Sequence, residues 1–526
     1  MWIDPARWSR QARALGAVLV LVSMTIAVRL PLLTEHQPID DEVNYSVIAR
    51  AVMGGGQPYA DAVERRPPLT FWIYEACFRL FGSGNWLALH GLAVLWVLLT
   101  MVALYAVVTR FFGRDAGVLA ALCYSVFQPW WYWGNLAFNG EVLMNLPVTA
   151  ALAVCLGAAR LSRSRLALAG GLIVTAFLLK QPSAIVLIPI AVYAARRAWT
   201  SDTDTLGATE VRSSVGQARA VLVSLSWLAA GCLAVLVPVS LWLASRGIWS
   251  DALYWSVLDH DVPHVFWAMG LEHTAAFLVV CLPLHVGAWW AATDASGWRR
   301  YPAEREALLM LLAVSCIGAS ASGRFFPHYY IGLLPALVLL AAPAYRRAPA
   351  LGKAGWHRWT LALGAVWMLV VSVLGAVRQE AAAHQLVQTT QAGAYIHEHS
   401  LADARVFVWG RSPRIYLDSD RLPATRYIDT FALTGRIFGP HLDGVDTRNR
   451  VVPGAWDQLR DDFARHPPAF IVDTQVGAWA EYPAGRFEWL ARTLRERYEP
   501  VADLAEGTVY RRVPDTELAT GPLPSR

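Results

Sequence analysis

Three acidic residues in a row stand near the start of the segment that follows the first hydrophobic stretch. They are Asp40, Asp41 and Glu42, in a segment that spans residues 34–85. Adjacent carboxylates repel one another and are costly to remove from water, so a purely structural role for all three is unfavourable beside a membrane boundary. A capped helix N-terminus would account for one acid, because carboxylates favour that position by ~0.3–1 kcal/mol. We therefore consider all three as candidates for a general base.

Two arginines supply the opposite charge further along the same segment. Arg65 and Arg66 precede Pro67-Pro68-Leu69, and the proline pair fixes the turn that holds Arg66. Guanidinium groups suit a phosphate or diphosphate, although ordinary contact with lipid headgroups is an alternative for both residues. A base and an anion clamp in one loop beside the bilayer indicate chemistry on a phosphorylated lipid.

The composition indicates that the chain carrying these residues is a membrane protein. Of its 526 residues, 56% are hydrophobic and 16% are charged, and the mean hydropathy is +0.36. A soluble protein could not bury so much apolar surface, so we expect a polytopic α-helical membrane protein. The net charge of +5 is small, and no basic tract with interleaved aromatic residues suggests binding of nucleic acid.

About eleven hydrophobic stretches divide the chain, which predicts about eleven transmembrane helices. They lie at residues 14–33, 86–109, 116–133, 142–159, 166–179, 182–195, 219–245, 274–292, 306–322, 329–345 and 359–377. Arginine-rich loops alternate with loops poor in positive charge, which predicts a cytoplasmic N-terminus. The first long loop and the C-terminal region are then outside. In that loop we expect two interfacial helices, one near residues 43–53 and one after Pro67-Pro68.

The polar region after residue 378 has the pattern of a small α/β domain. Residues 406–409 and 470–472 have the composition of short buried strands, and residues 456–465 and 487–497 have helical periodicity.

These patterns predict three parts of the chain. They are a membrane domain over residues 1–378, an extracytoplasmic α/β domain over residues 379–515 and a disordered tail over residues 516–526. Within the second part, the segment Trp409–Pro413, which contains Arg411, is a candidate for contact with an acceptor.

Further polar residues stand at the ends of hydrophobic stretches. Lys180 interrupts a long apolar run, where a lysine costs ~2.5–3.5 kcal/mol unless it reaches the interface or finds a partner. Arg324 and His328 lie at an outer span end, and Glu141 opens a hydrophobic stretch. The basic side chains could complete an anion site, while snorkelling and headgroup contact are the alternatives for them. A helix cap is the alternative for Glu141.

Three patches resemble the bacterial protein-mannosyltransferase-like and aminoarabinose-transferase-like families of GT-C membrane glycosyltransferases (glycosyltransferase family 39/83-like). The patches are Asp41-Glu42, Tyr45, Ala49-Arg50, Gly54, Arg66-Pro67-Pro68-Leu69 and Trp72; Leu179-Lys180-Gln181-Pro182; and Arg324 to Tyr330 with Leu333-Leu334-Pro335. The layout agrees over roughly residues 10–345. Where these families have a K-P-P-L motif, Arg66 replaces the lysine, which keeps the charge but changes its geometry and proton behaviour.

The resemblance implies a GT-C fold and an inverting sugar transfer in the bacterial cytoplasmic (inner) membrane. The donor would be a polyprenyl-phosphate sugar, and the acceptor a hydroxyl or phosphate of a glycan, lipid or protein outside the cytoplasm. Asp41 is the preferred base, with Glu42, Asp40 and Glu141 as further acidic candidates. The candidates for binding the donor phosphate are Arg66, Lys180, Arg324, His328 and Arg65, and the candidate pocket residues are Tyr45 and Tyr329.

A divalent metal, Mg²⁺ or Mn²⁺, stays open as a cofactor. Three carboxylates near a phosphate would bind one readily, yet arginine and lysine could serve instead. Asp259-His260-Asp261 and His264 also offer oxygen and imidazole ligands, although their spacing matches no strong signature and a plain polar loop explains them.

A transporter or flippase for lipid-linked sugars is the alternative from another functional class. It would also carry charged intramembrane residues and an anion site, but its two halves should repeat with matching broken helices. The sequence has no such repeat. A third interpretation, an inactive scaffold in envelope assembly, is disfavoured by the intact set of Asp41, Arg66 and Lys180.

Overall fold

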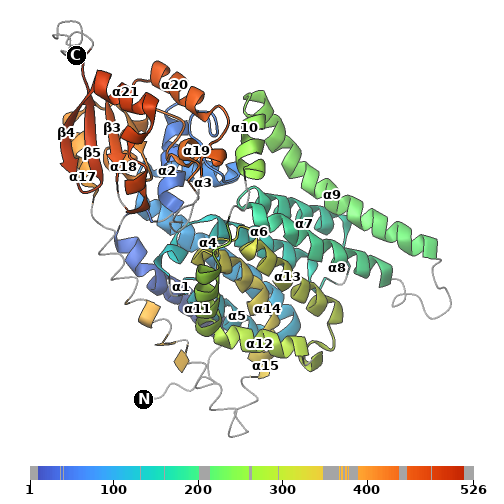
Figure 1. Cartoon of the computed structure of the whole chain (residues 1–526). Coiled ribbons are helices and arrows are strands. Elements are labelled where there is room, and N and C mark those ends of the chain that lie inside the picture. The colour runs from blue at the N-terminus through green and yellow to red at the C-terminus, as the bar shows by residue number, and fades with distance from the viewer. Residues whose placement is uncertain are drawn as a thin grey trace, which may run out of the picture.

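The computed structural model contains a helical body and a C-terminal sheet unit (Figure 1). It describes residues 10–347 except 36, 40, 131, 159, 201–213, 260–263 and 294; short pieces between 366 and 377; and residues 389–514 except 437–446 and 476. The predicted tail and most of the predicted last span, residues 359–377, lie outside the described residues.

The helical body contains three helices that are long and apolar enough to cross a membrane, counting only described residues. These are α1 (Arg10–Glu35), α4 (Trp86–Phe112) and α9 (Ser214–Ser245). A fourth span is added if α11 (Trp267–Val280) and α12 (Leu282–Thr293) are counted as one. That pair bends by 84°, so the stretch 274–292, predicted as one span, is broken after Val280. The number of eleven spans stays a prediction.

Shorter helices fill the rest of the body, which explains why many of the predicted stretches fell below the ~20 residues of an upright span. They are α5 (Arg114–Phe127), α6 (Gly140–Cys155), α7 (Arg163–Phe177), the 3-10 helix η3 (Gln181–Val186), α8 (Leu187–Thr200), α10 (Trp249–Leu253), the π-helix η4 (Tyr254–Leu258), α13 (Pro302–Ser320), the 3-10 helix η6 (Pro327–Leu333), α14 (Leu334–Leu340) and α15 (Ala342–Arg347). The break predicted at Lys180 is present, because the residue lies between α7 and η3.

Two short helices occupy the first long loop, as predicted. Helix α2 (Asp41–Met53) begins with two acids in its first turn, and α3 (Pro68–Phe81) begins after Pro67. Proline suits this position because the first helical N–H groups have no partner within the helix. Seven residues of α2 are buried, so the helix packs into the protein rather than presenting only one apolar face.

The C-terminal unit contains a five-stranded sheet of order β2-β1-β3-β5-β4. Its strands are β1 (Arg405–Trp409), β2 (Leu422–Pro423), β3 (Phe470–Thr474), β4 (Tyr498–Leu504) and β5 (Gly507–Arg512). The first three pair in parallel and the last two are antiparallel. Its helices are α17 (Gln391–His399), α18 (Arg414–Asp418), α19 (Phe431–Thr434), α20 (Ala455–Arg465) and α21 (Glu488–Arg497).

The predictions for this unit hold for its buried strands β1 and β3 and for its helices α20 and α21. The sequence did not reveal the hairpin of β4 and β5, whose residues are mostly part-exposed and lack a clean alternation. The hairpin gives the parallel strands an antiparallel neighbour, a common way to extend such sheets.

The sheet unit lies against the first long loop of the helical body (Figure 1). Val63 N–H donates to Arg426 O at 2.8 Å, and the side chain of Arg50 on α2 pairs with Asp420. A Cβ on Gly54 would come within 2.7 Å of the Leu422 side chain, so the two parts approach closely there. The unit therefore helps to fix the loop that carries the acidic and basic candidates.

Candidate functional site

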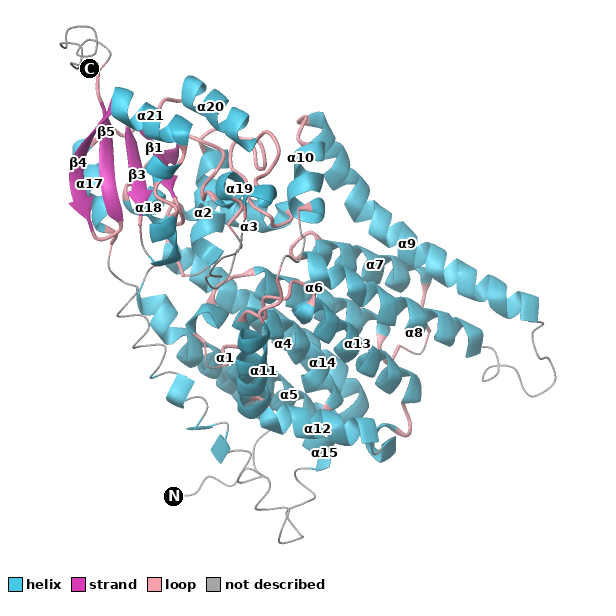
Figure 2. Cartoon of the chain, viewed as in Figure 1, coloured by secondary structure: helices cyan, strands magenta, loops and turns pink. Residues whose placement is uncertain are grey.

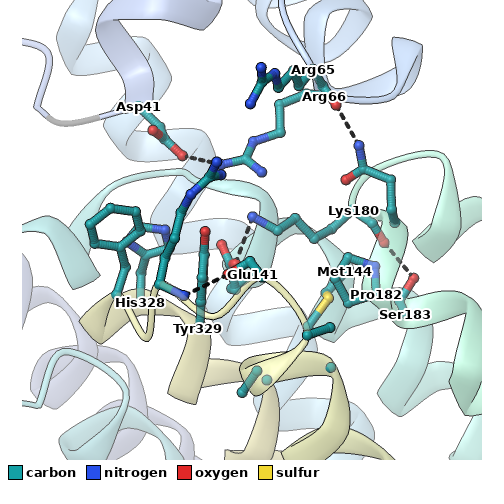
Figure 3. Close-up of a pocket in the computed structure, with 18 of the residues that line it drawn as sticks. Asp41, Arg65, Arg66, Glu141, Met144, Lys180, Pro182, Ser183, His328 and Tyr329 are labelled. Carbon is teal, nitrogen blue, oxygen red and sulfur yellow. Dashed lines mark hydrogen bonds and ion pairs between the residues drawn. The ribbon is translucent and has the colours of Figure 1, made fainter. Parts of the chain in front are cut away.

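A cavity of about 700 Å³ lies between the helical body and the C-terminal unit. Its inner wall comes from the helical body and includes the candidates Asp41, Arg65, Arg66, Glu141, Lys180, Arg324, His328 and Tyr329. Figure 3 shows several of these side chains directed toward one another from α2, the loop before α3, the start of α6, the segment before η3 and η6. Segments far apart in the sequence thus meet at one place.

Asp41, Tyr45 and Arg66 form a hydrogen-bonded triad at this wall. Arg66 Nη2 lies 2.8 Å from Asp41 Oδ2, and Arg66 Nε donates to the Tyr45 hydroxyl at 2.8 Å. The same hydroxyl donates to Asp41 Oδ2 at 2.9 Å. Burial alone would raise the pKa of the Asp41 carboxyl, but the guanidinium of Arg66 and two further basic side chains outweigh burial and hold this pKa well below its usual range. Asp41 is therefore ionised at neutral pH.

Glu141 and Lys180 form a second ion pair on the same wall. Lys180 Nζ lies 2.7 Å from Glu141 Oε1, and both side chains are almost fully buried. The ammonium also sits 5.1 Å from the ring centroid of Tyr329, within the range of a cation–π contact. Lys180 thus has a partner inside the protein, which offsets the cost of its position.

A glycine makes room for this lysine. A Cβ on Gly140 would lie 2.7 Å from Lys180 Cδ, a distance that real Cβ atoms do not reach. Glycine at the start of α6 therefore lets the lysine stem pass against the backbone.

Arg324 and His328 enter the cavity from the segment around η6. Next to Arg324, Phe325 has a positive φ of 50°, which is uncommon for a residue with a bulky side chain. Its carbonyl is hydrogen-bonded to His273 Nδ1 at 2.8 Å, and its ring packs onto Gly270. Such backbone strain persists where the surroundings impose it.

The loop before α3 is held from several sides. Tyr59, itself at a positive φ of 68°, donates its hydroxyl to Arg66 O at 2.7 Å. Gln181 donates to Arg65 O and, at 2.9 Å, to Ser256 O. These bonds fix the backbone of both arginines, whose sequence position alone could not specify where the guanidinium groups point.

Arg65 differs from Arg66 in its partner. Arg65 Nε lies 2.7 Å from Asp259 Oδ2, so one acid of the proposed Asp259-His260-Asp261 metal motif is bound to an arginine. Residues 260–263 lie outside the described residues. Within the part of the chain that the structure describes, no three His, Cys, Asp or Glu side chains gather into a group that could hold a metal ion.

Glu42 points away from the cavity. Its carboxylate is fully buried and accepts hydrogen bonds from Ile39 N at 3.0 Å and from Phe138 N at 2.6 Å, and it lies 3.2 Å from His90 Nε2. This geometry does not support Glu42 as the base. Its contacts instead hold α2, α4 and the chain before α6 together. Asp40 lies outside the described residues.

Apolar side chains from α6, η3 and α13 also line the cavity. Side chains that line it include Met144, Val148, Ile185, Val186 and Leu311. Ionic side chains and apolar side chains therefore line the same cavity.

The C-terminal unit supplies the outer wall, which sequence reasoning largely missed. It includes Arg411, Tyr427, Asp429, Phe431, Arg436 and Trp479. Of these, only Arg411 had been singled out, through the segment Trp409–Pro413. Loop residues have no periodicity that would mark them, so no signal in the sequence pointed to the others.

Comparisons with known proteins come from a family model and from solved structures. The model of the family described as dolichyl-phosphate-mannose-protein mannosyltransferase matches residues 65–209. No curated protein sequence matches the chain. A crystal structure of ArnT from Cupriavidus metallidurans in the apo state is similar with a TM-score of 0.57 and 17% identity, over 97% of this chain and 100% of that one.

Two further structures share the fold. ArnT from the same organism, bound to undecaprenyl phosphate, has a TM-score of 0.55 and 16% identity over 97% of this chain and 100% of that one. AglB, an archaeal oligosaccharyltransferase from Archaeoglobus fulgidus in complex with an inhibitory peptide and a dolichol-phosphate, has a TM-score of 0.51 and 12% identity, over 98% of this chain and 76% of that one. The fold is thus the predicted GT-C fold.

Proposed function

We propose that the chain is a GT-C-type membrane glycosyltransferase that moves one sugar from a polyprenyl-phosphate carrier to an acceptor hydroxyl or phosphate outside the cytoplasm. In the reaction, the bond between the anomeric carbon and the phosphate oxygen breaks as the acceptor oxygen bonds to that carbon from the opposite face. The acceptor loses its proton to a base, and the polyprenyl phosphate leaves with one more negative charge. Attack from the opposite face inverts the anomeric carbon.

This proposal depends on one observation: two acid–base ion pairs and a set of apolar side chains line the same cavity. Arg66 and Lys180 each face a carboxylate at 2.8 Å and 2.7 Å. A polyprenyl phosphate needs cations for its headgroup and a hydrocarbon surface for its chain, and this cavity offers both. The solved relatives described with undecaprenyl phosphate and with dolichol-phosphate support the same class of donor.

Arg66 couples donor binding to the base. With no donor bound, Arg66 neutralises Asp41 and lowers its pKa, which makes the carboxylate a weak proton acceptor. A donor phosphate would share the guanidinium and so weaken its hold on Asp41. The pKa of the carboxyl would rise toward its ordinary value, and the base would become effective only when a donor is present.

Lys180 and Arg66 would then stabilise the phosphate as its charge grows. Fixed cations in a site shielded from water contribute strongly to the rate. One well-placed hydrogen-bond donor group of the enzyme contributes about 10²–10³-fold. Glu141 keeps Lys180 in place through their ion pair, and Tyr45 orients both Asp41 and Arg66 through its hydroxyl. Arg324 and His328 line the same cavity and complete the anion site.

The placement in the cell is part of the proposal. The alternation of arginine-rich loops assigns the first long loop, the cavity and the C-terminal domain (residues 379–515) to the outer face of the bacterial cytoplasmic membrane. Residues 1–378 form the membrane domain. Membrane lipids would surround α9, most of which is exposed along its apolar length.

The test is sugar transfer by the purified protein in nanodiscs, with a set of polyprenyl-phosphate sugars and an envelope extract as acceptor. Asp41→Asn should lower turnover by about 10²–10⁴-fold, because a positioned base contributes that much, while donor binding persists. The anomeric configuration of the product, read by NMR, should be inverted. Unchanged turnover in Asp41→Asn would mean that another residue acts as the base. Movement of lipid between leaflets without transfer would contradict the enzyme and favour a flippase.

A further inference from the structure

The outer wall of the cavity carries two arginines, Arg411 and Arg436, and the second lies beside aromatic rings. Arg436 Cζ lies 5.0 Å from the ring centroid of Trp479 and 6.0 Å from that of Phe431. The two rings meet edge to face with centroids 5.3 Å apart. Arg411 lines the same wall, close enough that its charge adds to burial in lowering the pKa of Arg436. Figure 2 shows the loops around α19 on the side of the sheet that faces the helical body.

Each of these arginines follows a glycine that the fold holds tightly. Gly410 has φ +106°, and a Cβ there would lie 2.0 Å from Thr474 Oγ1. Gly435 has φ +67°, and a Cβ there would lie 2.0 Å from Thr447 O. Only glycine fits both the backbone conformation and the space. The fold therefore fixes the two points from which the arginine side chains start.

The chemistry of this wall differs from that of a general polar surface. Guanidinium groups bind carboxylate and phosphate in two-pronged geometry. Aromatic rings suit contact with the C–H groups of a sugar ring, and Trp479 lines the cavity with the part of its surface that Arg436, Phe431 and Tyr482 do not cover. Among the described residues that the C-terminal unit contributes to the cavity, two are arginines and one, Asp429, is acidic. The net charge and the rings together favour an acidic saccharide.

We propose that Arg411, Arg436 and Trp479 form an acceptor subsite for a saccharide that carries an acidic group, either a carboxylate or a phosphate. The inference rests on the proposed function, since it assigns the acceptor end of the same cavity. The inner wall, with Arg66 and Lys180, holds the donor phosphate. The outer wall binds the acidic group of the acceptor and holds the attacking oxygen near Asp41.

The test measures binding of free saccharides, without transfer, to the full-length protein in nanodiscs. The probes are methyl β-glucuronide, glucose 6-phosphate and neutral methyl β-glucoside, with tryptophan fluorescence or calorimetry as the readout. We expect at least one acidic probe to bind the wild type about tenfold more tightly than the neutral one, because one charge-assisted contact contributes on the order of 1.4 kcal/mol or more. The tighter of the two acidic probes identifies carboxylate or phosphate as the recognised group.

Arg411→Gln and Arg436→Gln should each remove most of this preference for the acidic probe. Trp479→Ala should weaken the binding of all three sugars, and Trp479→Phe should weaken it less. Arg492→Gln is the matched control, because Arg492 is an exposed arginine of the same unit that pairs with Glu488 outside the cavity. Thermal melting checks that each variant is folded. Equal binding of acidic and neutral probes to the wild type would overturn the proposal, as would a preference that survives in the double arginine variant.

Binding of undecaprenyl phosphate is measured on the same variants. A loss there as large as the loss of saccharide binding would assign the two arginines to the donor and overturn the subsite. Because no transfer is measured, these results are independent of the Asp41→Asn experiment. Failure of the subsite and failure of the proposed reaction can therefore be told apart.

Discussion

The two walls of the cavity place their cations against different partners. On the inner wall, Asp41 and Glu141 each pair with a cation at hydrogen-bond distance, so both carboxylates are neutralised within the protein. On the outer wall, Arg411 and Arg436 lie on loops of the sheet unit, and Arg436 stands beside the rings of Phe431 and Trp479. A donor phosphate can redistribute the ion pairs of the inner wall, whereas the outer wall sets an arginine against the rings of Phe431 and Trp479. The difference separates a place for reaction from a place for recognition.

Breaking the inner balance should give the largest effect. Lys180→Met removes the cation that faces Glu141 and leaves a buried carboxylate without its partner. We expect turnover to fall by about 10²–10³-fold, because a fixed cation at the donor phosphate is lost. We also expect the free energy of unfolding to fall by roughly 3–5 kcal/mol, the usual cost of a buried charge left alone. Sugar transfer and thermal melting in the same nanodisc preparation measure the two effects.

The double variant Lys180→Met/Glu141→Gln separates those two effects. Removing the second charge should restore much of the stability but none of the turnover. If turnover returned together with stability, Lys180 would serve only the fold and would not be one of the cations that bind the donor phosphate.

A smaller change to the same wall tests how finely it is built. Gly140→Ala places a methyl carbon only 2.7 Å from Lys180 Cδ. The lysine must shift by a fraction of an ångström or more, and misplacement on that scale costs up to about 10²-fold in rate. Gly91→Ala in α4 is the matched control, because a Cβ there meets nothing within 4 Å and alanine favours the helix. Equal activity of both variants would mean that the position of the lysine is not critical.

Glu42 tests whether the neighbouring acid belongs to the wall or to its support. Glu42→Gln weakens the bonds to Ile39 N and Phe138 N and the contact with His90. We expect a loss of about 1–3 kcal/mol of stability and a modest drop in turnover without a change in the shape of its pH profile. Asp41→Asn should show a far larger loss of turnover, together with some loss of stability from its ion pair with Arg66. A Glu42 variant that melts normally but does not turn over would return Glu42 to the chemistry.

Sequence patterns predicted the inner wall far better than the outer wall. Asp41, Arg66 and Lys180 stood out because charge beside a membrane is costly and therefore conspicuous. Their ion pairs could not be predicted, since the partners lie on segments about 25 and 40 residues apart whose packing the pattern does not specify. Glu42 looked equivalent to Asp41, and only the three-dimensional positions of His90 and Phe138 distinguish them. Arg436 and Trp479 lie in loops, where charge and aromatic rings are ordinary and carry no periodicity.

Asp429 gives the smallest expected effect and tests the electrostatics of the outer wall. Burial, and after it the nearby Glu64, raises the pKa of Asp429 to about 6, whereas in the unfolded chain it would be near 3.8. Between these values the folded state holds the proton more tightly, so ionisation of this group lowers stability as pH rises from about 4 to 6. Asp429→Asn should flatten that decline and raise the melting temperature at pH 7.5 by about 2 °C. If the melting temperature depended on pH in the same way in wild type and variant, the pKa of the Asp429 carboxyl would not be raised in the folded protein.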